Sequence, residues 1–145
     1  MPSHIVVGID GSAESDAALG FAYQEARLRS RPLRVVCVWS ASGVAYVGET
    51  FAPTADFFVE AEHHAEEVLR AALERLAPDP AVDIEAVSVE GQPAHELVEQ
   101  ARDAELLVVG SRGRGATASL LLGSVSQSLA HHTRCPLVIV PHSAD

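Results

Sequence analysis

Apolar residues gather in four short runs along the chain, and each run has the length of a β-strand. These runs are Ile5 to Ile9, Leu33 to Trp39, Leu106 to Val109 and Leu137 to Val140. Because the runs are continuous rather than alternating, they predict buried strands that are covered on both faces. A fifth run, Val82 to Val89, carries polar residues at near-alternate positions. That pattern predicts an edge strand with one wetter face.

The segments between these strands have the apolar spacing of helices. The predicted helices span Ala13 to Arg29, Asp56 to Leu76, Pro93 to Arg102, and a last segment that starts between Ser119 and Ser124 and ends near His132. Ser12 is a suitable N-cap for the first helix, and Glu14 and Asp16 suit the positive end of its dipole. Strands that alternate with helices indicate a doubly wound α/β fold, with a parallel sheet between two helical layers.

Length and composition are consistent with one compact domain over residues 1–145. The chain has 145 residues, of which 48% are hydrophobic and 21% charged, close to the average for globular proteins. Its formal net charge is -10, and its ten basic residues are all arginines. Such acidity repels the phosphate backbone and argues against a nucleic-acid partner. It also repels ATP, so a nucleotide site would have to depend on local helix N-termini, arginines or a divalent cation.

Nothing in the chain has the pattern of a leader or a membrane span. The start, Met-Pro-Ser-His, leads directly into an apolar strand, and no apolar run approaches the roughly 20 residues that a spanning helix needs. Cys37 and Cys135 lie in or beside apolar runs, where reduced thiols are the ordinary state. These features predict a cytoplasmic protein.

Glycines dominate the segment between the strand at Leu106 to Val109 and the last helix. Glycine backbones approach a phosphate closely, and the N–H groups at a helix start attract it. The P-loop pattern fits from Gly110 to Thr117 except that Ala116 replaces the required lysine. The dinucleotide fingerprint fits Gly113, Gly115 and Ala118 but lacks the acidic residue that should follow. A P-loop hydrolase and NAD binding are therefore both disfavoured.

A third phosphate motif, G-x2-G-x9-G-[ST], is met with the correct spacing by Gly110, Gly113, Gly123 and Ser124. With this motif the chain resembles the ATP-binding branch of the universal stress protein family. The resemblance extends from Ile-Val-Val-Gly-Ile-Asp-Gly-Ser near the start to Cys-Pro-Leu-Val-Ile-Val-Pro near the end. It implies a three-layer sandwich with a five-stranded parallel sheet in the order 3-2-1-4-5, a Rossmann-like fold of the adenine nucleotide α-hydrolase type.

The resemblance also implies a binding site for ATP, with Mg²⁺, at the carboxyl ends of the first and fourth strands. In that site Val38 would contact adenine, Asp10 the ribose side or a metal-bound water, and Gly110 and Gly113 the ribose and α-phosphate. Gly123, Ser124 and Val125 would bind the outer phosphates. The remaining candidate nucleotide-binding residues are Gly8, Ser111, Arg112, Arg114 and Gly115.

Family members pair their last strand across a two-fold axis, so the resemblance implies a homodimer through residues 136–141. It implies a regulatory module in stress response whose nucleotide state alters contacts with an unknown protein partner. Two alternatives stay open: an interaction protein that binds no nucleotide, and a slow ATPase. Self-phosphorylation at Ser119, Ser126 or Ser128 is a further hypothesis, although Asp10 is the only evident general base, which argues against fast turnover.

Overall fold

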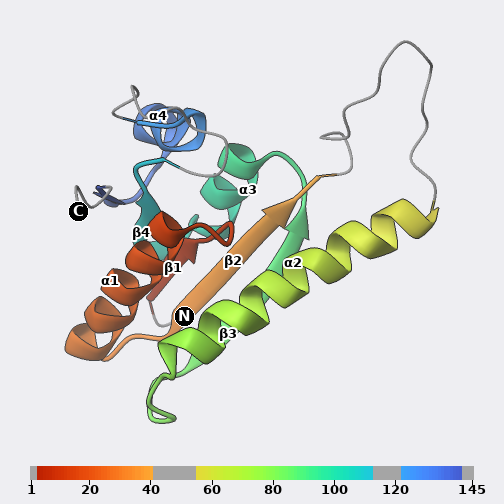
Figure 1. The fold of residues 1–145 in the computed structure, drawn as a ribbon. Coiled ribbons are helices and arrows are strands. Elements are labelled where there is room, and N and C mark those ends of the chain that lie inside the picture. Colours follow the sequence, from red (N-terminus) through yellow and green to blue (C-terminus); the bar gives the residue numbers. More distant parts are fainter. Residues whose placement is uncertain (1–2, 41–54, 113–121, 142–145) are drawn as a thin grey trace.

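The computed structural model describes residues 3–40, 55–112 and 122–141, and strands alternate with helices along them (Figure 1). The elements are β1 (His4–Gly8), α1 (Ala13–Arg29), β2 (Leu33–Trp39), α2 (Ala55–Leu76), β3 (Ile84–Glu90), α3 (Pro93–Gln100), β4 (Ala104–Gly110), α4 (Ser124–His132) and β5 (Leu137–Val140). All five predicted strands and the four predicted helices are present in these ranges. Their ends differ by one or two residues: α2 starts one residue earlier and α3 ends two residues sooner than predicted, and the bounds of β1, β3 and β4 are shifted by similar amounts.

The strands form one five-stranded parallel sheet in the order β3-β2-β1-β4-β5. This order confirms the 3-2-1-4-5 prediction, and β1 lies at the centre with β2 and β4 on either side. Val7 of β1 is in register with Val35 of β2 and with Val108 of β4. Because all the strands run the same way, the carboxyl ends of β1 and β4 lie side by side, and open α/β sheets bind their ligands outside these strand ends.

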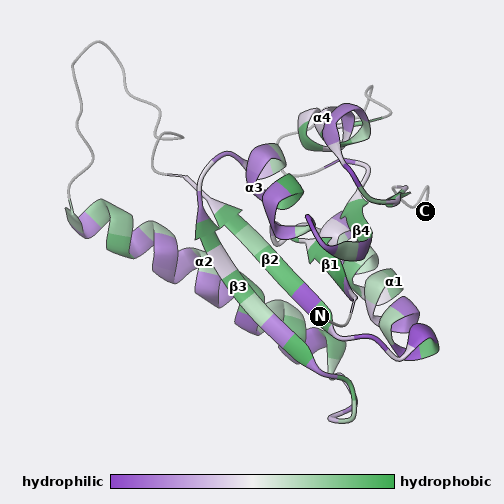
Figure 2. Ribbon diagram, turned by 180° about the vertical axis from the view of Figure 1, so that it is seen from behind, coloured by the Kyte–Doolittle hydropathy of each residue, from purple (hydrophilic) through white to green (hydrophobic). Residues whose placement is uncertain are grey.

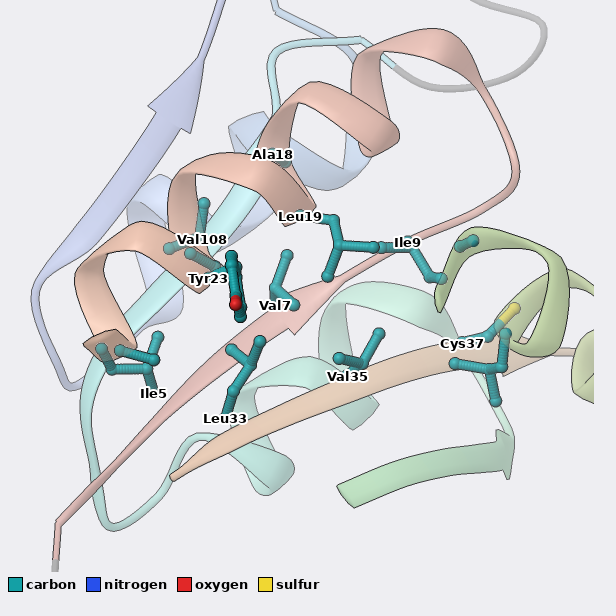
Figure 3. Packing of buried hydrophobic residues seen from close by; sticks show 14 of the residues in the cluster. Ile5, Val7, Ile9, Ala18, Leu19, Tyr23, Leu33, Val35, Cys37 and Val108 are labelled. Carbon is teal, nitrogen blue, oxygen red and sulfur yellow. The ribbon is translucent and has the colours of Figure 1, made fainter. Parts of the chain in front are cut away.

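Two apolar clusters cover the two faces of this sheet. On one face, alternate residues of β1, β2 and β4 pack against α1 and α2, and Figure 3 shows Val7, Leu19, Tyr23 and Val35 in this cluster. The intervening strand residues pack on the other face against α3 and α4. In Figure 2 the central strands are largely hydrophobic, whereas α2 alternates between hydrophobic and hydrophilic residues. Strand side chains point alternately to the two faces of the sheet, and each helix turns one apolar side toward a face, which explains the two apolar layers.

The last strand lies at the edge that the implied strand order gives it, but it is not covered on both faces as its apolar run predicts. Every residue of β5, Leu137–Val140, is only partly buried, in contrast to the strands at the centre of the sheet. The reason is topological, because β5 pairs with β4 on one side and is the outermost strand on the other. An apolar run thus identified a strand correctly but not its place at the edge of the sheet.

Candidate functional site

The candidate site lies at the carboxyl edge of β1 and β4, and its first part is the turn between β1 and α1. Gly11 adopts a φ of 88°, in the left-handed region that favours glycine. The N–H of Ser12 donates to Oδ1 of Asp10 at 2.9 Å. The Ser12 side chain then caps α1 by accepting a hydrogen bond from the N–H of Ser15 at 3.1 Å, which confirms the predicted N-cap. Asp10 is therefore held at the end of β1.

The second part of the site is a connection between the exit of β4 and the start of α4. The N–H of Gly123 donates to the Ser111 carbonyl at 2.6 Å, and the hydroxyl of Ser126 donates to the same oxygen at 2.7 Å. Ser126 is only 2% exposed. The N–H of Ser111 donates in turn to Val140 of β5 at 2.8 Å. These bonds bring the first and the last glycine of the motif, Gly110 and Gly123, to one end of the sheet.

The third part is an interaction between the first turn of α1 and the residue that follows β4. Oε2 of Glu14 accepts the backbone N–H of Arg112 at 2.8 Å, and Oε1 of Glu14 lies 3.6 Å from Nε of Arg112. Both side chains are mostly buried, with exposures of 13% for Arg112 and 15% for Glu14. The Glu14 carboxylate thus interacts with both the backbone N–H and the guanidinium of Arg112, a residue of the motif that the sequence predicts to bind phosphate.

Two of the predicted site glycines have a packing role that the structure shows directly. A Cβ on Gly110 would lie 3.3 Å from the backbone of Glu14, so the glycine lets the first turn of α1 approach the end of β4. A Cβ on Gly8 would lie 2.8 Å from Cδ1 of Leu97 on α3. Both glycines are therefore explained by close packing around the site, independently of any ligand.

The other predicted contacts that the structure describes lie near the end of β2 and at the start of α4. Val38 lies near the end of β2, and Val125 lies in the first turn of α4; both pack against the apolar cluster beneath α3 and α4. Ser124 is the first residue of α4 and is exposed, while Gly123 occupies the N-cap position without a side-chain cap. The start of α4 therefore presents the backbone N–H groups of Ser124 and Val125, which are of a kind that binds anions, whereas the N–H of Gly123 donates to the Ser111 carbonyl.

Three predicted site residues, Gly113, Arg114 and Gly115, lie outside the described residues, as does Ser119. The hydroxyl of Ser126 is buried and donates to the Ser111 carbonyl, which argues against the hypothesis that it accepts a phosphoryl group. Sequence reasoning did not anticipate that Ser126 joins β4 to α4, nor that Glu14 contacts Arg112. The sequence position of Glu14 indicates only a favourable interaction with the dipole of its own helix.

Many of the described ionic interactions lie away from this edge. Glu105, near the amino end of β4, accepts hydrogen bonds from Arg29 at 2.9 Å and from Arg31 at 3.0 Å. The bond from Arg29 is the main reason that the pKa of Glu105 is lowered from its usual range. Asp16 binds Arg75 of α2 through two hydrogen bonds, at 2.9 and 3.0 Å. These pairs stabilise contacts between elements, whereas Arg112 is a basic residue at the site itself.

Neither a cluster of metal ligands nor a membrane-spanning helix occurs in the described part of the chain. Within residues 3–40, 55–112 and 122–141 no three histidine, cysteine or acidic side chains gather closely enough to hold a metal ion. Over the same ranges, every helix is too short or too polar to cross a membrane.

Comparison with known proteins gives consistent relatives. The family model described as "Universal stress protein family" matches residues 1–141. Universal stress protein Rv2005c of Mycobacterium tuberculosis is 36% identical over 143 residues, which is 97% of this chain and 48% of that protein. The chain thus spans about half the length of this curated relative.

Two solved structures share the fold over nearly their whole length. A universal stress protein in complex with cAMP is 30% identical, with a TM-score of 0.71 over 98% of each chain. The universal stress protein of Archaeoglobus fulgidus in complex with dAMP is 25% identical, with a TM-score of 0.67 over 95% of this chain and 97% of the other. Together with the family match and the sheet order, these likenesses show that the chain belongs to the universal stress protein family.

Proposed function

We propose that this chain binds ATP, with Mg²⁺, between the carboxyl ends of β1 and β4 and acts as a nucleotide-dependent regulatory module. The observation that carries the proposal is the junction at the Ser111 carbonyl. Its bonds from Gly123 at 2.6 Å and Ser126 at 2.7 Å join the exit of β4 to the start of α4. This junction brings glycine backbone and a helix N-terminus to the same edge as Asp10, which is an arrangement suited to phosphate.

A hydrogen-bond donor of the site already binds a negatively charged oxygen. The Arg112 N–H holds a carboxylate oxygen of Glu14 at 2.8 Å, and a phosphate oxygen makes the same kind of charge-assisted hydrogen bond. The cAMP and dAMP complexes of the two related structures support an adenine nucleotide rather than another anion. Under this proposal Val38 contacts the base and Asp10 lies on the ribose or metal side. Ser124 and Val125 bind the outer phosphates, because the N–H of Gly123 already donates to the Ser111 carbonyl.

Magnesium fits the site only as a companion of the nucleotide. Mg²⁺ usually keeps several waters and is held by one or two carboxylates together with substrate phosphates. Under the proposal Asp10 supplies this carboxylate, and no cluster of three potential ligands exists among the described residues. We therefore propose metal binding that depends on the nucleotide, with cytoplasmic location and a single domain as accompanying expectations.

Nucleotide binding is tested by calorimetry with ATP, AMP and GTP, and in parallel by the fluorescence of Trp39. This tryptophan is the only one in the chain and ends β2, next to Val38, so a bound adenine should change its emission. We expect saturable binding of ATP to the wild-type protein. Ser126→Ala should weaken it by roughly fivefold to tenfold, the cost of about one hydrogen bond of 1 to 1.5 kcal/mol that positions the start of α4.

The matched control is Ser128→Ala, which removes a hydroxyl from the same helix without touching the Ser111 carbonyl. Its affinity for ATP should equal that of the wild type. Equal affinities for Ser126→Ala and Ser128→Ala would show that the junction does not support binding. No nucleotide bound to the wild type, either in calorimetry or in mass spectrometry of the purified protein, would favour an interaction protein without a nucleotide.

We further propose a homodimer through residues 136–141. The strand β5 is apolar, partly exposed along its whole length, and outermost in the described sheet. Such an edge invites pairing with another chain. Ile139→Lys should dissociate the dimer in sedimentation equilibrium at micromolar concentration, while Ala86→Lys on the opposite edge strand β3 should leave it intact. A wild-type protein that sediments as a stable monomer would contradict this proposal.

A further inference from the structure

We propose that Glu14 competes with the phosphates of the bound nucleotide and thereby sets how strongly the site favours ligands with more phosphate charge. This inference rests on the proposed nucleotide binding and goes beyond it, because it concerns which ligand the site selects. The residue lies on α1, outside the glycine motif. Its carboxylate nevertheless contacts Arg112, which lies within the motif.

The competition follows from shared donors. Glu14 accepts the backbone N–H of Arg112 at 2.8 Å and lies 3.6 Å from the Arg112 guanidinium. A backbone N–H and an arginine are the groups that bind phosphate oxygens in proteins, and a carboxylate oxygen satisfies them in the same way. A phosphate that uses either donor must therefore displace Glu14 or share the donor with it.

The position of Glu14 is fixed by packing rather than by chance orientation of a surface side chain. Gly110 has no side chain, so the backbone of Glu14 can pack closely against it. A Cβ on Gly110 would lie only 3.3 Å from that backbone. The Ser12 cap and the buried Ser15 hold the same first turn of α1 against the sheet. Glu14 keeps only 15% of its side chain exposed. Its carboxylate therefore cannot swing into solvent without breaking contacts.

Charge determines the sign of the effect. If Glu14 stays in place, its negative charge lies close to the incoming phosphate and repels it in a partly buried setting, where screening by salt is weak. If Glu14 is displaced, its hydrogen bond with Arg112 is lost. Either outcome weakens binding more for ATP than for AMP, and hardly at all for adenosine. The overall charge of -10 adds a background repulsion that a control must remove.

The test compares Glu14→Gln with Asp16→Asn by calorimetry with ATP, AMP and adenosine. Glutamine keeps an oxygen that accepts the Arg112 N–H but removes the charge. Asp16→Asn removes the same charge from the same helical turn, but Asp16 binds Arg75 of α2 instead of the site. We expect Glu14→Gln to bind ATP about tenfold more tightly and AMP about threefold more tightly, as removal of one nearby repulsive charge allows. Adenosine affinity should stay within about twofold, and Asp16→Asn should match the wild type within about twofold for all three ligands.

Several outcomes would overturn the inference. If the wild type binds ATP but Glu14→Gln binds it no more tightly than Asp16→Asn, Glu14 does not compete. If Glu14→Gln binds ATP more weakly, Glu14 acts instead as a support that presents Arg112. If none of the three proteins binds ATP, the proposed function fails and this inference fails with it. ATP binding to Glu14→Gln alone would support competition. Thermal melts monitored by circular dichroism check folding, and Glu14→Ala replaces Glu14→Gln if that variant does not fold.

Discussion

Replacing Leu129 with alanine is expected to lower the free energy of unfolding by about 3 kcal/mol, within the range measured for buried leucines. Leu129 is 0% exposed and lies in α4, and its cluster includes Val6 of β1 and Leu107 of β4. The alanine would leave a cavity between α4 and the sheet that the surrounding strands cannot close. The same cavity would loosen the helix whose start forms part of the candidate site.

Urea unfolding followed by circular dichroism measures this loss, and Leu28→Ala provides the control. Leu28 is 78% exposed on α1, so its truncation should change stability by less than about 0.5 kcal/mol. ATP affinity of folded Leu129→Ala should also fall, because Gly123 and Ser124 lose their support. A Leu129→Ala protein as stable as Leu28→Ala would mean that α4 does not pack against the sheet as described.

The apolar pattern predicted the fold because each strand face had to be buried against a helical layer. Continuous runs such as Ile5 to Ile9 became central strands, and the polar residues of Val82 to Val89 identified an edge strand. The run Leu137 to Val140 is the exception, since hydrophobicity alone does not distinguish a central strand from an apolar edge strand. The order of the strands came from the resemblance to a family and not from the pattern.

The candidate site was only partly predictable, because its key contacts join residues that are distant in sequence. The motif spacing identified Gly110, Gly123 and Ser124, and the structure brings the first two to one edge through the Ser111 carbonyl. Glu14 and Arg112 are 98 positions apart in the chain, and nothing in either local sequence indicates that they meet. Ser126 looked like an ordinary helix serine until its burial was known.

Gly8 illustrates why a glycine in a site motif is ambiguous. Its place near the end of β1 is the place where a ligand would approach, and sequence analysis assigned it to nucleotide binding. The structure shows that Leu97 of α3 already occupies the space that a Cβ would need, at 2.8 Å for Cδ1 and 3.0 Å for Cδ2. Leu97 is only 4% exposed, so it has little room to move away. Packing is therefore a sufficient reason for this glycine.

A double-mutant cycle between Gly8 and Leu97 tests that reason. Gly8→Ala is expected to cost about 2 kcal/mol in the wild-type background, because the new methyl group overpacks the core. Leu97→Ala should cost about 3 kcal/mol through the cavity that it leaves. In the Leu97→Ala background the clash is absent and the Gly8→Ala methyl fills part of the cavity, so its cost should fall to near zero, a coupling of about 2 kcal/mol.

Urea unfolding of the four proteins gives the coupling, and ATP calorimetry on the same proteins separates packing from ligand contact. If Gly8 serves packing alone, the folded double variant should bind ATP as tightly as the folded Leu97→Ala protein. If its backbone must approach the ligand, the double variant should regain stability but not affinity. Equal costs of Gly8→Ala in both backgrounds would rule out Leu97 as the reason for the glycine, and the close approach of β1 to a ligand would then become the better explanation.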